Sequence, residues 1–176
     1  MQASDGRDRA EAIGLALLAT VKAFAGLMVQ GVLVNQAHIG AKDAAQAIQN
    51  AVDAMALVCV DGCYGLLHAD MIGLNLYLSE RLWLADDRQG AFDALDAALD
   101  HARRFEAVCM QNEVHFTAPL LSEVSEKIDG GMEPGFIVRL PEDWPWWHDS
   151  DSAKVEAEIK ADPRWTEWVK RTRQSR

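Results

Sequence analysis

Residues 75–105 read as two amphipathic helices joined by a short polar turn, and this pattern restricts the fold more than any other in the 176-residue chain. Leucines recur at helical spacing on the apolar faces, and small residues occur where two helices must approach closely. The leucines are Leu78, Leu82 and Leu95, and the small residues are Ser79, Ala91 and Ala98. A helical hairpin of this kind is typical of helical repeats, which normally form binding surfaces.

An earlier stretch repeats part of this spacing. Alanine, a branched aliphatic residue and alanine occupy positions 0, +4 and +7 in two segments that lie 47 residues apart. The later set is Ala91, Leu95 and Ala98, and the earlier set is Ala44, Ile48 and Ala51. Two helical hairpins stacked side by side explain this repeat, and an alanine-rich bundle without repeats is the alternative.

The remaining pattern predicts an all-α chain with one irregular segment. The predicted helices cover residues 8–36, 41–60, 64–85, 90–107, 111–127 (disturbed by Pro119) and 152–160. A final short helix begins at Asp162-Pro163, because Asp is a favoured N-cap and Pro a favoured first helical residue. We expect residues 1–128 to form a helical-repeat domain, with the Pro- and Trp-rich connector and C-terminal helices of 129–176 packed on it as one domain.

Charge and cysteine content limit the class of partner. The net charge of −10 argues against a nucleic-acid surface, because phosphate contacts need clustered Lys and Arg. Three cysteines, an odd and sparse number, suit a reducing cytoplasm better than a disulfide scaffold. We therefore expect a cytoplasmic protein with no direct contact to nucleic acid.

Residues 12–34 are long enough to span a bilayer and contain a single charge, Lys22, near the middle. Alanine and glycine dilute the hydrophobicity of this segment, and mixed charges rather than a basic region precede it. We expect a buried core helix here and no membrane contact.

Residues 75–105 also resemble a tetratricopeptide unit. Leu78 and Ser79 stand where that repeat has its Leu-Gly pair, and Ala91, Leu95 and Ala98 stand at its second-helix positions. The resemblance implies antiparallel helical hairpins packed as a tetratricopeptide-like repeat.

Three further motifs lie in the C-terminal part of the chain. They are Ala98–His101–Ala102–Phe105, Thr117–Ala118–Pro119–Leu120 and Asp162–Pro163–Arg164–Trp165. Together, over roughly residues 75–172, they resemble the C-terminal region of bacterial Cro/repressor-type helix-turn-helix transcription regulators that carry a tetratricopeptide-like domain. The resemblance implies a regulatory domain that binds a protein, a peptide or a small effector. In that family the DNA-binding domain precedes this region, so we expect either an excised sensor domain or a stand-alone relative.

Two groups of residues suggest chemistry. Cys59, Cys63 and His68 have the spacing C-x₃-C-x₄-H, but a structural zinc site needs a fourth ligand and free cysteines commonly behave as small buried hydrophobes. His101 and His115 lie among charged residues, but no nucleophile is paired with a base at a recognisable spacing. We expect no metal, no cofactor and no catalytic residue.

Groove-facing side chains are the first candidates for ligand binding. Helical hairpins stacked in one direction present a concave face formed mainly by the first helix of each pair. We therefore expect exposed side chains of Asn75, Glu80 and Arg81 to line a groove.

Tryptophans are the second candidates. Indoles supply large contact areas at recognition sites, so Trp144 and Trp147 in the connector are interpreted as a lid over the groove, with a structural strap as the alternative. Trp165 and Trp168 fall on one helical face and are expected to be structural.

The sequence favours a non-enzymatic all-α domain that binds a protein, a peptide or a small effector. With a net charge of −10, the favoured partner is neutral or basic rather than nucleic acid. A homodimer formed by a structural dimerisation domain is one alternative, and a small cytoplasmic helical enzyme or metal-binding protein is another.

Overall fold

The computed structural model describes residues 2–58, 65–109, 113–115, 125–127 and 150–174. Its helices are α1 (Gln2–Val34), α2 (Ala41–Ala56), α3 (Gly65–Leu84), α4 (Arg88–Cys109), α6 (Ser150–Ala161) and α7 (Pro163–Gln174). The predicted all-α class is confirmed for this part of the chain. The predicted helix ends agree to within a few residues, except that α1 begins earlier.

The helix predicted over residues 111–127 is wrong where the structure describes that segment. Two three-residue strands, β1 (Glu113–His115) and β2 (Ser125–Lys127), pair antiparallel there, with Val114 opposite Glu126. Pro119 cannot donate a helical hydrogen bond, and β-branched Val114 favours extended backbone. Among the described residues this pairing is the only sheet.

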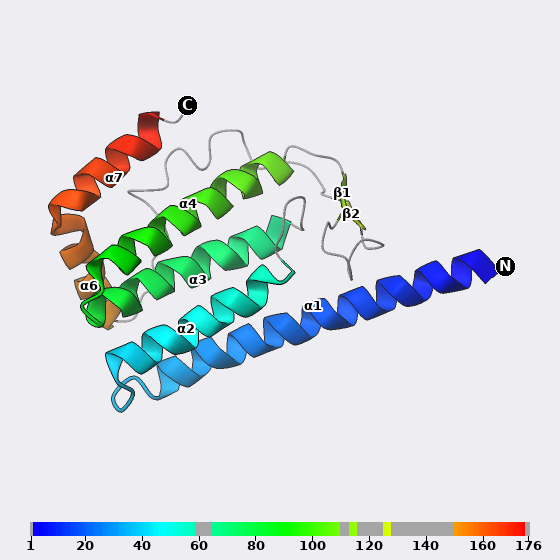
Figure 1. The fold of residues 1–176 in the computed structure, drawn as a ribbon, viewed down its shortest axis with the longest axis horizontal. Helices are drawn as coiled ribbons and strands as arrows, with labels where there is room; N and C mark the ends of the chain where they lie inside the picture. The colour runs from blue at the N-terminus through cyan, green and yellow to red at the C-terminus, as the bar shows by residue number, and fades with distance from the viewer. Residues whose placement is uncertain (1, 59–64, 110–112, 116–124, 128–149, 175–176) are drawn as a thin grey trace.

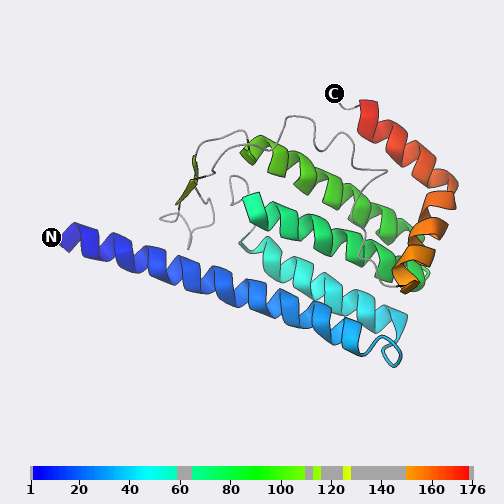
Figure 2. The same cartoon turned by 180° about the vertical axis from the view of Figure 1, so that it is seen from behind.

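The first four helices lie side by side in chain order, each antiparallel to the next, and α6 and α7 lie at the far end of α3 and α4 (Figure 1). The reverse view keeps this order and shows the N-terminal half of α1 extending beyond the other helices (Figure 2). In this arrangement α1 is the outermost helix at one end of the row.

Helix α3 belongs to two hydrophobic clusters. Leu67, Met71 and Leu78 pack with α1 and α2 around Ile48 and Met55. On the opposite side, Leu76 and Trp83 pack with residues from α4, α6 and α7, which include Ala91, Leu95, Ala98, Ile159 and Trp168. The expected burial of Ala91 and Ala98 is confirmed, since neither exposes any surface.

Two turns are closed by aspartates. Asp86 adopts a positive φ of 64°, which Asp tolerates better than most residues, and Asp87 Oδ1 accepts the backbone N–H of Gly90 at 2.9 Å. Asp162 Oδ1 accepts the backbone N–H of Arg164 at 2.9 Å, so the predicted start of the last helix is confirmed.

The expectation that residues 12–34 form a buried core helix is wrong. In α1, residues Asp8–Val34 are long and apolar enough to cross a membrane by length and composition, yet only 22% of the most apolar window is buried. One face of α1 packs on α2 through Ala25, Val29 and Val32. The other faces stay open because α1 ends the row and its first half extends past it (Figure 2).

Candidate binding groove

A cleft of about 620 Å³ lies between α1 and α3, above the end of α2. Its lining is Lys22, Ala23, Ala25, Gly26, Leu27, Val29 and Gln30 of α1, Met55 of α2, and Ala69, Asp70, Gly73 and Leu74 of α3. We call this cleft the α1–α3 groove. It is lined mainly by the first helices of the two hairpins, which are the elements that the repeat pattern indicated.

Small residues on both walls create the space. Ala23 and Gly26 on α1 face the groove together with Ala69 and Gly73 on α3. A Cβ atom added at Gly26 would meet no other atom within 4 Å. Because these wall residues carry short side chains, the space between the two helices is left unfilled.

One ion pair joins the two walls. Lys22 Nζ lies 2.8 Å from Asp70 Oδ2, and both side chains are about two-fifths exposed, at 39% and 40%. An ion pair this accessible contributes at most about 1 kcal/mol to stability. Its charges are nevertheless fixed beside an apolar floor, where they can orient one polar end of a ligand.

The predicted groove residues on α3 are not exposed, and that prediction is wrong. Asn75, Glu80 and Arg81 expose 2%, 0% and 4% of their surfaces. The Asn75 side-chain amide donates to the carbonyl of Met71 at 2.8 Å. Arg81 Nη2 lies 3.4 Å from Glu80 Oε2, and its guanidinium lies 4.7 Å from the centre of the Tyr77 ring.

The cause of this error is the position of α3 in the row. All residues from Leu74 to Arg81 are buried, because α2 and α4 flank the helix and α6 contacts it as well. The expectation assumed one exposed face. The run Leu74, Leu76, Tyr77 and Leu78 was an available signal, since a helix that is apolar around its circumference is normally buried.

Trp144 and Trp147 lie outside the described residues, so the lid remains a prediction. Trp165 and Trp168 are buried at 8% and 0% exposure, which confirms their structural assignment. Their rings stack with centroids 5.0 Å apart, and the Trp168 indole N–H donates to Asp96 Oδ1 at 2.7 Å. This hydrogen bond joins α7 to α4.

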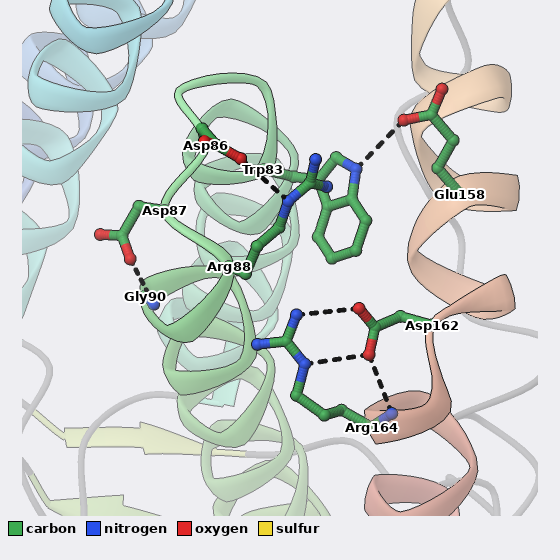
Figure 3. Close-up of polar contacts among 8 residues, drawn as sticks. All are labelled: Trp83, Asp86, Asp87, Arg88, Gly90, Glu158, Asp162 and Arg164. Atoms are coloured by element: carbon green, nitrogen blue, oxygen red, sulfur yellow. Dashed lines mark hydrogen bonds and ion pairs between the residues drawn. The ribbon is translucent and has the colours of Figure 1, made fainter.

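A second hydrogen bond from an indole joins the C-terminal helices to the α3–α4 hairpin. The Trp83 indole N–H donates to Glu158 Oε2 at 3.2 Å, and the Arg88 guanidinium lies 3.6 Å from the Trp83 ring centre (Figure 3). We call the two indole–carboxylate bonds the C-terminal clasp. Next to it, the hydrogen bond from the Arg164 side chain lowers the pKa of Asp162 to about 2. The clasp holds α6 and α7 on the α3–α4 hairpin and leaves the groove on the other side of α3 open.

A buried histidine, His68, and a half-buried one, His101, face each other between α3 and α4. His68 Nδ1 and His101 Nδ1 lie 3.0 Å apart, so one ring donates a proton and the other accepts it in its neutral form. Burial and, to a lesser extent, the nearby His68 together lower the pKa of His101 to about 4, while Asp100 opposes the shift. At neutral pH the His101 ring is therefore uncharged.

The lowered pKa of His101 predicts that the folded protein loses stability in acid. The unfolded chain binds a proton at His101 near pH 6.5, whereas the folded chain resists it until about pH 4. Between these values the unfolded state holds more protons, so the free energy of unfolding should fall as pH falls from 6.5 to 4. Denaturant unfolding of the wild type and of His101→Gln across this window should give a steeper decline for the wild type. Parallel declines would contradict the assignment.

The cysteines weighed as zinc ligands in the sequence, Cys59 and Cys63, lie outside the described residues, so the expectation of no metal there remains a prediction. His68, the third candidate ligand, is turned toward His101. Among the residues that the structure describes, no group of three or more His, Cys, Asp and Glu is placed to hold a metal ion.

Comparisons with known proteins do not assign this chain to a family. Protein-family models, curated proteins and solved structures were each searched, and none matches the chain.

Proposed function

We propose that this chain is a non-enzymatic interaction domain that binds a protein segment, a peptide or a small effector in the α1–α3 groove. The observation that carries the proposal is the groove itself. Its volume of about 620 Å³ is that of a ligand site, and its apolar floor with one fixed ion pair has the usual composition of one.

An apolar helical segment is the favoured occupant. The groove residues of α1 run from Lys22 to Gln30, about 12 Å along the helix, which matches roughly two turns of a bound helix. Short side chains at Gly26 and Gly73 let a second backbone approach closely. The occupant's apolar side chains would contact Met55 and Leu74, with a polar group beside the Lys22–Asp70 pair.

We further propose that the helices pack as a tetratricopeptide-like repeat and that the chain is a regulatory domain of a bacterial transcription regulator. Burial of both alanine triplets supports the packing, since no residue of either set is more than 3% exposed. The sequence resemblance over residues 75–172 supports the regulatory role. The net charge of −10 favours a neutral or basic partner and a chain that makes no direct contact with nucleic acid.

Peptides selected from a random display library against the full chain provide the probe. Gly26→Leu should weaken their binding at least about 10-fold, because the added side chain fills the groove. The same change should raise the melting temperature, since Leu is favoured over Gly in a helix by about 0.5–1 kcal/mol.

Gly6→Leu is the matched control. Gly6 lies on the same helix, a Cβ there also meets no atom within 4 Å, and it does not line the groove. Selected peptides that bind Gly26→Leu as well as they bind Gly6→Leu would contradict the proposed site.

A further inference from the structure

A second apolar surface runs along α1. Large apolar side chains are exposed at Ile13 (53%), Phe24 (41%), Leu27 (67%) and Val34 (79%). With the partly buried Leu17 and the exposed Thr20 and Gly31, they alternate at spacings of four and three residues. That is the spacing of the a and d positions in a coiled coil. We call these seven residues the outer stripe.

The outer stripe is separate from the surfaces already described. At 3.6 residues per turn it lies about 120° around α1 from Ala25, Val29 and Val32, which pack on α2. Lys22 and Gly26 of the α1–α3 groove lie on the other side of the helix, and only Leu27 contributes to both surfaces.

The two ends of the helical row are unequal. At the α4 end, α6 and α7 cover the row through the C-terminal clasp. At the α1 end, Leu17 of the outer stripe packs against the core cluster, but the large side chains of Ile13, Phe24, Leu27 and Val34 are exposed. Helical repeats normally need a polar outer face on a terminal unit, so an apolar stripe at this end indicates that something packs against it.

Charge favours a second copy of the chain as the occupant. The stripe contains no charged residue, and the one charge of residues 12–34, Lys22, is paired with Asp70 on the side away from the stripe. The net charge of −10 is therefore carried elsewhere. Two copies that meet through their outer stripes avoid the like-charge repulsion that other faces would produce.

We propose that a second copy of this chain packs antiparallel against the outer stripe and forms a two-fold symmetric dimer. The spacing is compatible with this symmetry, because Phe24 then faces Phe24 of the other copy. Leu27 faces Thr20, Val34 faces Ile13 and Leu17 faces Gly31, so that large side chains meet small ones in two of the layers. The two helical rows become one row of eight helices.

The size of the stripe sets the strength of this dimer. The helical segment from Ile13 to Val34 that carries the stripe spans about 33 Å, and a helix about 10 Å wide gives a face of roughly 330 Å² per copy. This area is typical of a functional apolar patch but lies below the roughly 800 Å² per partner of a standard interface. The dimer is therefore reversible and dependent on concentration.

A lipid surface is a less favourable occupant. Helix α2 packs along the C-terminal half of α1, and its exposed residues include Lys42, Asp43 and Asp53. A bilayer that enclosed α1 would have to enclose these charges as well, or α1 would have to leave α2.

Sedimentation velocity of the full chain across a concentration series tests the dimer. The wild type should show a reversible monomer–dimer equilibrium. Phe24→Glu should weaken it at least about 100-fold, because each dimer loses two buried rings and gains two facing carboxylates. Leu15→Glu is the matched control, since Leu15 has a similar exposure of 47% but lies on the opposite side of α1. It should leave the equilibrium unchanged.

Cross-linking tests the orientation. Phe24→Cys should form an intermolecular disulfide, and Ile13→Cys mixed with Val34→Cys should cross-link although neither variant does so alone. A parallel dimer would cross-link each of these two variants by itself. Oxidised wild type reports the contribution of the three native thiols.

Several outcomes would overturn the dimer. The first is a wild type that stays monomeric at every concentration. The second is an equal effect of Phe24→Glu and Leu15→Glu on the monomer–dimer equilibrium, with unchanged circular dichroism. The third is a monomer that co-sediments with phosphatidylcholine–phosphatidylglycerol vesicles and loses this binding in Phe24→Glu. Gly26→Leu should leave the dimer intact, so failure of the dimer and failure of the groove are distinguishable.

Discussion

Trp168→Ala is expected to lower the free energy of unfolding by about 3–5 kcal/mol, the usual cost of removing a buried large aromatic side chain. Trp168 has no exposed surface, stacks on Trp165 and donates its indole N–H to Asp96. Its loss leaves a cavity among α4, α6 and α7 and removes half of the C-terminal clasp. Guanidinium unfolding followed by far-ultraviolet circular dichroism measures the effect.

Trp168→Phe is a milder change at the same site. It retains a six-membered aromatic ring but removes the five-membered ring with its N–H donor, and Asp96 is about half exposed and can be solvated by water. The expected loss combines the hydrogen bond, about 1–2 kcal/mol, with a cavity smaller than that of Trp168→Ala, so it should lie between that figure and the loss for Trp168→Ala. A loss below about 1 kcal/mol for Trp168→Ala would show that α6 and α7 are not held by this contact.

Ala98→Leu is expected to destabilise the fold by about 1–3 kcal/mol through overpacking. Ala98 is fully buried on α4, in the cluster that contains Leu76 and Trp83 of α3. Three additional carbon atoms must displace α4 from α3 or force strained side-chain conformations. Thermal or denaturant unfolding reports the change.

Ala107→Leu controls for the same substitution in the same helix. Ala107 is exposed, so the change there should stay within about 0.5 kcal/mol. Equal stability of the Ala98 and Ala107 variants would contradict close packing of the α3–α4 hairpin.

Outside residues 111–127, local patterns predicted the described helices and most of their ends. The alanine triplets identified the buried faces of α2 and α4, and Asp162-Pro163 identified the start of α7. These features depend on residues close in sequence, whose spacing and capping chemistry are readable without tertiary information.

The candidate site was predicted only in part. The pattern indicated a surface formed by the first helices of the two hairpins, but it placed that surface at Asn75, Glu80 and Arg81, which are buried. The groove is instead built by small residues such as Gly26 and Gly73. Exposure depends on which helix lies at the end of the row and which lies inside it, and this order is not encoded in the period of a single helix.

Amide hydrogen exchange of the full chain, with and without a display-selected peptide, tests the proposed binding site most directly. Bound peptide should slow exchange in residues 22–30 and 69–74, which include the residues that line the α1–α3 groove on α1 and α3. Slowed exchange confined to α4, α6 and α7, with no change in those two segments, would contradict the proposed site.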